Sequence, residues 1–292
     1  MQRPEQPLKG YVAVVVGATR GAGRGIAIEL GSAGAIVYCT GRSTSVARSV
    51  LNRPETIEET AELVNAAGGV GIARRVDYSA RTNVQDFFRE LEKDQAGRLD
   101  ILVNDIGGDQ GVRWKTPFWD IPSEEGFSMI DAGIKTHLMA GHYSLPLMVR
   151  RRQGLVIEVT DGDDRNYRGS FYYDFIKIAH QRIAEVWARE LEDYGVTAVA
   201  LTPGFIRSEA VLDSLNVSEE NWMSALVSEP TLAGSESPHF IGKVIVRLVH
   251  DPELKSKSGQ TLSSWALADE YQIQDLDGTR PHWKNFYTNF KL

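Results

Sequence analysis

The stretch Val12-Ala-Val-Val-Val16-Gly17-Ala-Thr-Arg-Gly21-Ala-Gly23-Arg-Gly25-Ile decides the fold of this chain. An apolar run of strand length is followed at once by glycines spaced Gly-x-x-x-Gly-x-Gly, and then by a segment of helical period. Such glycines let the backbone turn tightly and approach a pyrophosphate at a helix N-terminus, where free N–H groups and the helix dipole favour anions. Because it lies between a first strand and a first helix, the stretch predicts a dinucleotide site.

Outward from this stretch, short apolar runs alternate with longer segments of helical period. We expect strands at residues 12–16, 36–40, 70–74, 99–103, 155–159, 196–201 and 260–262, and helices at about 22–33, 56–67, 81–94, 124–150, 171–193 and 237–250. This order predicts an α/β fold of the Rossmann type, a doubly wound parallel sheet of about seven strands with helices on both faces. No repeat or low-complexity linker interrupts the alternation, so residues 1–292 are predicted to form a single domain.

Two segments depart from the alternation. Residues 207–236 are rich in Leu, Trp, Ser and Glu and are expected to form a helical flap over the substrate. Apolar side chains in and near this segment would line a substrate pocket or form the flap's own small core; they are Phe205, Ile206, Val211, Leu212, Leu215, Trp222 and Met223. Residues 263–292 form an aromatic tail, which we expect to pack against the body or a partner subunit.

Composition excludes several classes of function. The formal charge of -7 argues against general binding to nucleic acid or an anionic membrane, which needs clustered Lys and Arg. Cys39, the single cysteine, lies in an apolar run, so disulfides within the chain and Cys-rich zinc sites are excluded, and no spacing of His, Asp and Glu suggests a metal. The N-terminal residues lack a signal peptide and no apolar run approaches about 18 residues, so we expect a cytoplasmic protein.

The end of the second predicted strand indicates the cofactor. It reads Cys39-Thr40-Gly41-Arg42-Ser43, without the acid that usually binds the ribose 2′-hydroxyl of NAD. Arg42 here and Arg20 in the glycine stretch have the bidentate geometry that suits a 2′-phosphate. Unless both are ordinary surface arginines, the pattern predicts NADP(H).

Tyr173-Asp-Phe-Ile-Lys177 follows the fifth predicted strand. Residues four apart share a helix face, so the phenol and the ammonium can address one ligand, and a nearby cation favours the phenolate form of a tyrosine. Together with the glycine stretch, this pattern resembles the short-chain dehydrogenase/reductase family over roughly residues 10–262. The C-terminal region, with Asp251-Pro252, Ser258-Gly259 and Asp277-Gly278, looks like its dehydrogenase/reductase member 1-like branch.

The resemblance implies Tyr173 and Lys177 as the catalytic pair. It also implies that an NADP(H) molecule contacts Gly17, Thr19, Arg20, Gly21, Ala22, Gly23, Thr40, Arg42, Ser43, Asp77, Tyr78, Asn104, Gly107, Tyr173, Lys177, Pro203, Gly204, Ile206 and Ser208. Asp105 departs from the family's Asn-Asn-Ala-Gly turn, and Ser208 replaces its usual threonine.

Two further departures concern the catalytic residues. In the family, a serine at the end of the fifth strand holds the substrate oxygen. Counting forward from Gly154 places Asp161 at the position of this serine, whereas counting back from Tyr173 places Thr160 at it. A one-residue slip reverses the face, so the two cannot both point inward from a regular strand.

The family's helix before Pro146 carries an asparagine that supports a water relay to the lysine, and Gly133 stands in its place. Candidates for a substitute are Lys135, Thr136 and His137, while His142 and His180 are interpreted as ordinary helix residues.

The family resemblance implies an NADPH-dependent oxidoreductase that reduces the C=O bond of an apolar small molecule, as a homodimer or homotetramer. Pteridine reductases of the family resemble this chain in pairing an Asp with the Tyr and Lys, so an alternative is a C=N reductase. Asp161 beside Tyr173 would either stay protonated and donate a hydrogen bond or stay ionised because the substrate is cationic, and the pteridine reductases favour the ionised form. A third alternative is a non-catalytic NADP(H)-binding regulator, since the serine and the asparagine are both replaced.

Overall fold

The computed structural model describes residues 6–48, 53–108 and 111–290. Residues 1–5, on which the expectation of no signal peptide largely rests, lie outside this part, as do residues 291–292 of the predicted tail. Among the described residues, no helix has both the length and the apolar character that crossing a bilayer requires.

A seven-stranded parallel sheet forms the centre of the molecule, with the strand order β3-β2-β1-β4-β5-β6-β7. The strands are β1 Val12–Val16, β2 Ile36–Gly41, β3 Val70–Arg75, β4 Ile101–Asn104, β5 Gly154–Val159, β6 Val196–Thr202 and β7 Thr261–Ser263. The predicted α/β fold of Rossmann type is confirmed, although β4 begins two residues later than expected. The strand order reverses between β1 and β4, and such a switch point opens a crevice at the carboxyl ends of the strands.

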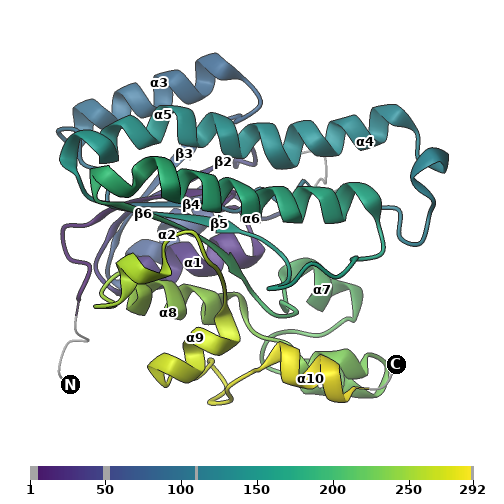
Figure 1. Cartoon of the computed structure of the whole chain (residues 1–292). Coiled ribbons are helices and arrows are strands. Elements are labelled where there is room, and N and C mark those ends of the chain that lie inside the picture. Colours follow the sequence, from purple (N-terminus) through teal and green to yellow (C-terminus); the bar gives the residue numbers. More distant parts are fainter. Residues whose placement is uncertain (1–5, 49–52, 109–110, 291–292) are drawn as a thin grey trace.

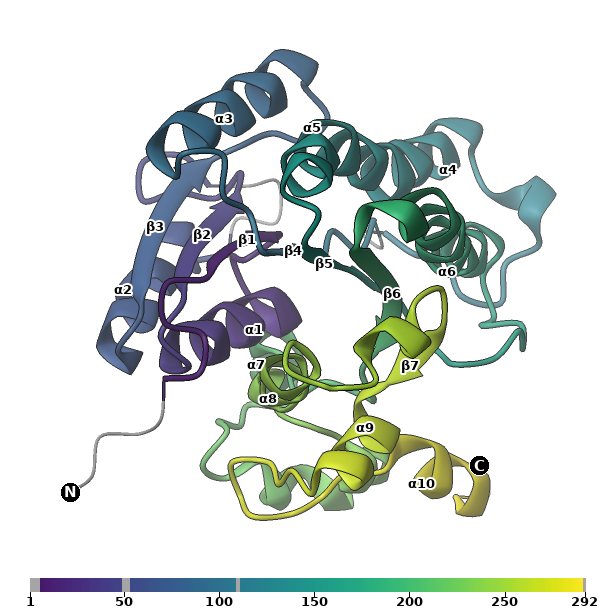
Figure 2. The same ribbon diagram turned by 60° about the vertical axis from the view of Figure 1, so that its left-hand side comes forward.

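Helices cover both faces of the sheet (Figures 1 and 2). One face carries α1 Gly21–Ser32, α2 Ile57–Ala67 and α8 Pro238–Leu248; the other carries α3 Arg81–Asp94, α5 Thr136–Arg151 and α6 Phe171–Leu191. Local signals fix several helix ends, since Thr56 accepts a hydrogen bond from the Glu59 N–H at the start of α2 and Ser237 caps α8 ahead of Pro238.

Helices α1 and α8 pack closely against each other. Gly25 of α1 faces the Pro238 carbonyl, and a Cβ at position 25 would overlap that group. A hydrogen bond joins the same two helices, with His239 Nδ1 2.7 Å from Glu29 Oε1. The N-terminal half of the chain is therefore bound to its C-terminal half directly behind the glycine stretch.

The single long helix predicted at 124–150 is wrong, because a π-helical turn interrupts it. The structure has α4 Ser123–Ile130, the turn η2 Asp131–Lys135 and then α5. In this turn, Gly133 packs under Ile176 of α6, where a Cβ would lie 2.6 Å from the Ile176 methyl group. π-turns of this kind occur frequently at functional sites.

The predicted flap is largely formed by short helices: α7 Glu209–Ser214 and the 3₁₀ turns η4 Trp222–Val227 and η5 Pro230–Gly234. Its apolar residues, including Leu212 and Trp222, form a small core of their own. The tail contains α9 Ser264–Tyr271 and α10 Trp283–Asn289. Buried Arg207 links these segments, since its guanidinium lies 2.7 Å from Glu219 and 3.4 Å from Asp275.

Candidate active site

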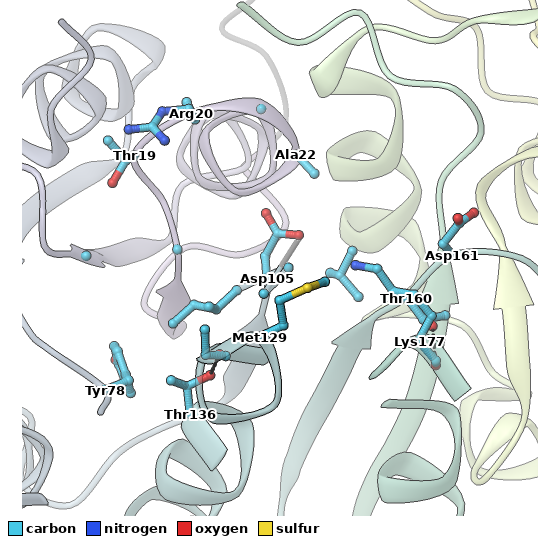
Figure 3. A pocket seen from close by; sticks show the side chains of 18 of the residues that line it. Thr19, Arg20, Ala22, Tyr78, Asp105, Met129, Thr136, Thr160, Asp161 and Lys177 are labelled. Atoms are coloured by element: carbon cyan, nitrogen blue, oxygen red, sulfur yellow. Dashed lines mark hydrogen bonds between the residues drawn. The ribbon is translucent and has the colours of Figure 1, made fainter. Parts of the chain in front are cut away.

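A cleft of about 1160 Å³ lies along the carboxyl ends of the strands. Figure 3 shows Thr19 and Arg20 at one end, Lys177 and Asp161 at the other, and Asp105 and Met129 between them. The cleft exceeds the roughly 300–1,000 Å³ of ordinary small-molecule pockets, as an extended dinucleotide plus a substrate requires.

Helix α6 carries Tyr173 and Lys177 into this cleft. The Lys177 Nζ lies 5.2 Å from the centre of the Tyr173 ring, close enough for a cation–π contact. The Lys177 side chain is buried, whereas Tyr173 packs edge-on against Trp114 with ring centres 5.0 Å apart. The phenol and the ammonium therefore face the same part of the cleft.

Asp161 and Thr160 take different roles in the structure. The Tyr173 hydroxyl donates a hydrogen bond to Asp161 Oδ2 at 2.8 Å. The buried Thr160 hydroxyl instead donates to the Lys177 backbone carbonyl at 2.7 Å. Thr160 thus fastens β5 to α6, and the side chain beside the phenol is that of Asp161.

Arg168 supports the loop that carries Asp161. Its Nε donates to the Asp161 backbone oxygen at 2.6 Å and lies 3.9 Å from the carboxylate, while its Nη1 lies 2.9 Å from Asp174. The Asp161 side chain is 44% exposed and the Arg168 side chain only 9%. A solvent-exposed carboxyl group therefore faces the phenol.

The N-terminus of α1 faces the middle of the cleft, as predicted for a phosphate site. One of its N–H groups is already bonded, since the Gly21 N–H donates to Glu209 Oε2 at 2.8 Å. The Arg24 Nε lies 3.6 Å from the other oxygen of this carboxylate. The flap helix α7 therefore places a carboxylate beside the glycine stretch.

The two arginines predicted to recognise a 2′-phosphate both line the cleft, in different surroundings. Arg42 is exposed and forms no ion pair with any residue of the described part of the chain. Arg20 Nε lies 3.4 Å from Glu55, an acid that sequence reasoning missed, and Glu55 is also bonded to Arg53.

Most of the predicted site residues line the cleft together. They are Gly17, Thr19, Arg20, Gly21, Ala22, Arg42, Ser43, Asp77, Tyr78, Gly107, Thr160, Asp161, Tyr173, Lys177, Pro203, Gly204, Ile206 and Ser208. Gly23, Thr40 and Asn104 lie behind its wall. Gly23 packs on the backbone of Gly17, Thr40 donates to the Val15 carbonyl at 2.8 Å, and Asn104 donates to Glu158 at 2.5 Å.

None of the three candidates for a relay at Gly133 bonds to Lys177. Exposed Lys135 lies 3.8 Å from Asp131, Thr136 donates to the Ala132 carbonyl, and His137 is bonded to Glu158. The Gly133 carbonyl oxygen instead lies 2.8 Å from Nε2 of His180. The sequence had suggested that His180 is an ordinary helix residue. Only the fold shows this contact, since the two residues lie on different helices.

Trp283 is one of the lining residues that the sequence did not reveal; others, such as Phe127 and Met129, come from α4. Trp283 reaches the cleft from α10, packs on Gly204, and its ring centre lies 5.9 Å from that of Phe205. Of the apolar flap residues considered as pocket lining, Phe205 and Ile206 reach the cleft. The tail therefore supplies part of the apolar wall that the flap was expected to supply.

A sequence profile described as short chain dehydrogenase matches residues 11–217. The chain belongs to the short-chain dehydrogenase/reductase family. Dehydrogenase/reductase SDR family member 1 of Mus musculus is 34% identical over 291 residues, 98% of this chain and 89% of that protein. The Homo sapiens protein of the same name is 32% identical over 277 residues, 93% of this chain and 85% of that protein. The resemblance to this branch is confirmed.

Solved structures of the short-chain dehydrogenase/reductase family share the fold. A short chain dehydrogenase from Mycobacterium thermoresistibile superposes with a TM-score of 0.78 at 20% identity, covering 94% of this chain and 92% of that chain. A hydroxysteroid dehydrogenase from Escherichia coli gives a TM-score of 0.71 at 22% identity, covering 89% and 97%. At such identities the likeness extends to the fold alone.

Members of this family are oxidoreductases that bind nicotinamide cofactors, and the cleft fits such a group. The N-terminus of α1 would hold the pyrophosphate and Asp77 and Tyr78 would contact the adenine, while Pro203 and Gly204 line the same cleft as Tyr173. When bound, the nicotinamide supplies or accepts hydride.

Proposed function

We propose that this protein is an NADPH-dependent reductase of a C=O bond in an apolar small molecule. The observation that carries the proposal is the placement of the Tyr173 phenol and the Lys177 ammonium side by side in the cleft. A purely regulatory NADP(H)-binding protein has no need of a proton donor with an adjacent cation.

In this proposal Tyr173 donates the proton that neutralises the oxygen of the substrate as its carbon receives hydride. The Lys177 charge stabilises the phenolate that remains, because an opposite charge nearby favours the ionised form. The aromatic rings of Trp114, Phe205 and Trp283 surround this region and favour an apolar substrate.

The choice of NADPH rests on Arg42. Its guanidinium lines the cleft where β2 ends, is exposed, and has no ion-pair partner among the described residues. An arginine here accommodates a 2′-phosphate, and β2 ends in Thr40 and Gly41 without the acid that would bind a 2′-hydroxyl.

The test is NADPH oxidation by the purified protein against a panel of ketones, aldehydes, quinones, cyclic imines and pterins. Turnover of apolar carbonyl compounds, with NADPH preferred over NADH, supports the proposal. Tight NADPH binding without turnover of any compound would instead favour the regulatory role.

A second candidate, reduction of a C=N bond, is favoured by the hydrogen bond from Tyr173 to Asp161. An ionised carboxylate beside the phenol repels a developing alkoxide but attracts an iminium or a protonated heterocycle. Asp161→Ser should shift the ratio of kcat/KM values towards ketones, and Asp161→Asn should harm the imine reaction most. An unchanged ratio in both variants would eliminate this candidate.

We also propose a cytoplasmic homodimer or homotetramer. Helices α5 and α6 expose Leu138, Phe171 and Phe175, with 46%, 41% and 50% of each residue accessible, and such apolar side chains are commonly covered by a partner subunit. Sedimentation equilibrium tests the assembly, and a monomer at micromolar concentration would contradict it.

A further inference from the structure

The inner side of the Tyr173–Lys177 helix is closed by a buried imidazole ring. His180 lies one turn after Lys177 on α6 and is fully buried. Its Nε2 lies 2.8 Å from the Gly133 carbonyl oxygen in the π-turn, and its Nδ1 lies 3.0 Å from the Val159 carbonyl oxygen. The His180 ring therefore fills the position from which a water molecule would donate a hydrogen bond to the Gly133 carbonyl oxygen.

A second imidazole lies directly on the first. The rings of His137 and His180 are stacked with their centres 4.0 Å apart and their planes within 10°. His137 Nδ1 lies 2.5 Å from Glu158 Oε2, and its Nε2 lies 2.9 Å from the Ile106 carbonyl. All four ring nitrogens thus face protein oxygens, and none is directed to solvent.

This buried cluster has no exposed member. The side chains of His137, His180, Glu158 and Asn104 are all 0% accessible. Burial, together with the neighbouring His137 and Lys177, holds the pKa of His180 well below its usual value. Ile176 packs over Gly133 on the remaining side. A proton that approached the catalytic helix from this side would have to pass through fully buried side chains.

The opposite side of the phenol is open. The Tyr173 hydroxyl donates to the Asp161 carboxylate at 2.8 Å, and the Asp161 side chain is 44% exposed. Arg168 holds the Asp161 backbone in place while leaving the carboxylate in contact with solvent. Asp161 therefore connects the Tyr173 hydroxyl to solvent.

We propose that the proton given up by Tyr173 in each turnover is replaced from solvent through Asp161, while His180 and His137 seal the inner side of the catalytic helix. This inference rests on the proposed reductase function. It assigns Asp161 a role as proton carrier for a C=O substrate and for a C=N substrate that binds as the neutral imine.

The proton balance is simple. The Tyr173 O–H bond breaks as the substrate gains its new O–H or N–H bond, and the hydride comes from the reduced nicotinamide. The phenolate then lies beside the Asp161 carboxylate, and the repulsion between two negative charges favours uptake of one proton by the pair. Solvent protonates the exposed carboxylate, and the carboxyl group passes the proton to the phenolate. Each turnover consumes one NADPH and one proton.

The decisive variant is Asp161→Ala, measured with the best substrate of the panel. We expect kcat to fall about tenfold or more, as for loss of a general acid–base group, with the NADPH dissociation constant within about twofold of the parent. Added formate, a small carboxylate, should restore kcat in a saturable way. A rise in kcat rather than a fall in KM separates proton transfer from binding of a cationic substrate.

Two further variants serve as controls. Asp164→Ala removes an acid from the same loop whose carboxylate bonds to Asn166, and it should neither lose activity nor respond to formate. Asp161→Ala should alter the solvent deuterium isotope effect on kcat. His180→Gln should lower the thermal midpoint but leave that isotope effect unchanged. If His180→Gln alters that isotope effect as Asp161→Ala does, the proton passes on the inner side and the proposal is wrong.

Failure of the inference is distinguishable from failure of the proposed function. A parent protein that reduces carbonyl compounds while Asp161→Ala keeps full kcat, or gains nothing from formate, overturns the proton route alone. A parent protein that turns over neither carbonyl nor imine substrates overturns the function as well.

Discussion

The guanidinium of Arg20 lies 3.4 Å from the carboxylate of Glu55, so the two arginines at this end of the cleft are not equivalent. Glu55 partly neutralises Arg20, whereas Arg42 has no ion-pair partner among the described residues and is the arginine that we propose binds a 2′-phosphate. We expect the parent to bind NADPH at least about tenfold more tightly than NADH, a difference of about 1.4 kcal/mol. Arg42→Ala should remove most of this preference and Arg20→Ala less of it. Fluorescence titration of both cofactors measures the ratios, and equal affinities in the parent would contradict the assignment of NADP(H).

Replacing Tyr173 by Phe removes the proposed proton donor and the hydrogen bond to Asp161 while keeping the packing against Trp114. We expect kcat to fall by a factor of about a hundred or more, with NADPH binding nearly intact. The neighbouring Tyr172→Phe is the control, because Tyr172 is buried in a small apolar cluster beside Ile121 and Met129. If Tyr173→Phe keeps most of the activity, the catalytic assignment is wrong.

Glu209→Gln should tighten NADPH binding. Its carboxylate accepts the Gly21 N–H at the start of α1, where a pyrophosphate is expected, and two anions at one helix terminus repel each other. Removing the charge should lower the dissociation constant about two- to fivefold, in line with about 0.3–1 kcal/mol for a charge near a helix end. Glu220→Gln, an exposed flap residue, is the matched control. Weaker binding would show that the carboxylate mainly orders the loop.

Trp283→Ala should open the wall of the substrate pocket. The indole packs on Gly204 and lies against Phe205, so its loss removes a large apolar contact surface. We expect KM for apolar substrates to rise about tenfold while the NADPH dissociation constant changes little. Trp119→Ala is the control, since Trp119 is 80% exposed and lies outside the cleft. Equal effects of the two changes would exclude a wall formed by α10.

Glu236 makes stability depend on pH. Burial raises the pKa of this carboxyl to about 8, against the opposing hydrogen bonds from Ser264 and the Gly204 N–H. The folded protein therefore keeps a proton that the unfolded chain loses near pH 4.5, so the free energy of unfolding falls between about pH 4.5 and 8. Glu236→Gln should match the parent at pH 5 and exceed its thermal midpoint at pH 8. Parallel melting curves across this range would contradict the buried, protonated state.

The strands, the glycine stretch and the Tyr173–Lys177 pair were predictable because each depends on residues close together in the sequence. Apolar runs fix the strands, and a spacing of four fixes a shared helix face. The end of the fifth strand also left two candidates, Thr160 and Asp161, for the position that a serine occupies in the family. Only their hydrogen bonds show that Asp161 is the one beside the phenol.

The contacts that could not be predicted from the sequence join segments that are far apart along the chain. His180 meets Gly133 only because a π-turn replaces a regular stretch of helix, and no periodicity marks that turn. Glu55 reaches Arg20 from the segment just before α2, and Trp283 reaches Gly204 from the tail. Such contacts depend on how helices and loops dock on the sheet, which propensity and patterning do not specify.

The close packing of Gly25 against Pro238 has a consequence for how the protein matures. The helix that presents its N-terminus to the phosphates is supported from behind by α8, which is synthesised late. A nascent chain that has not yet made α8 lacks this support, so its cofactor site is incomplete. A dinucleotide that binds only the finished fold stabilises it by mass action. A cofactor bound at this helix terminus would therefore add to the stability of the native fold.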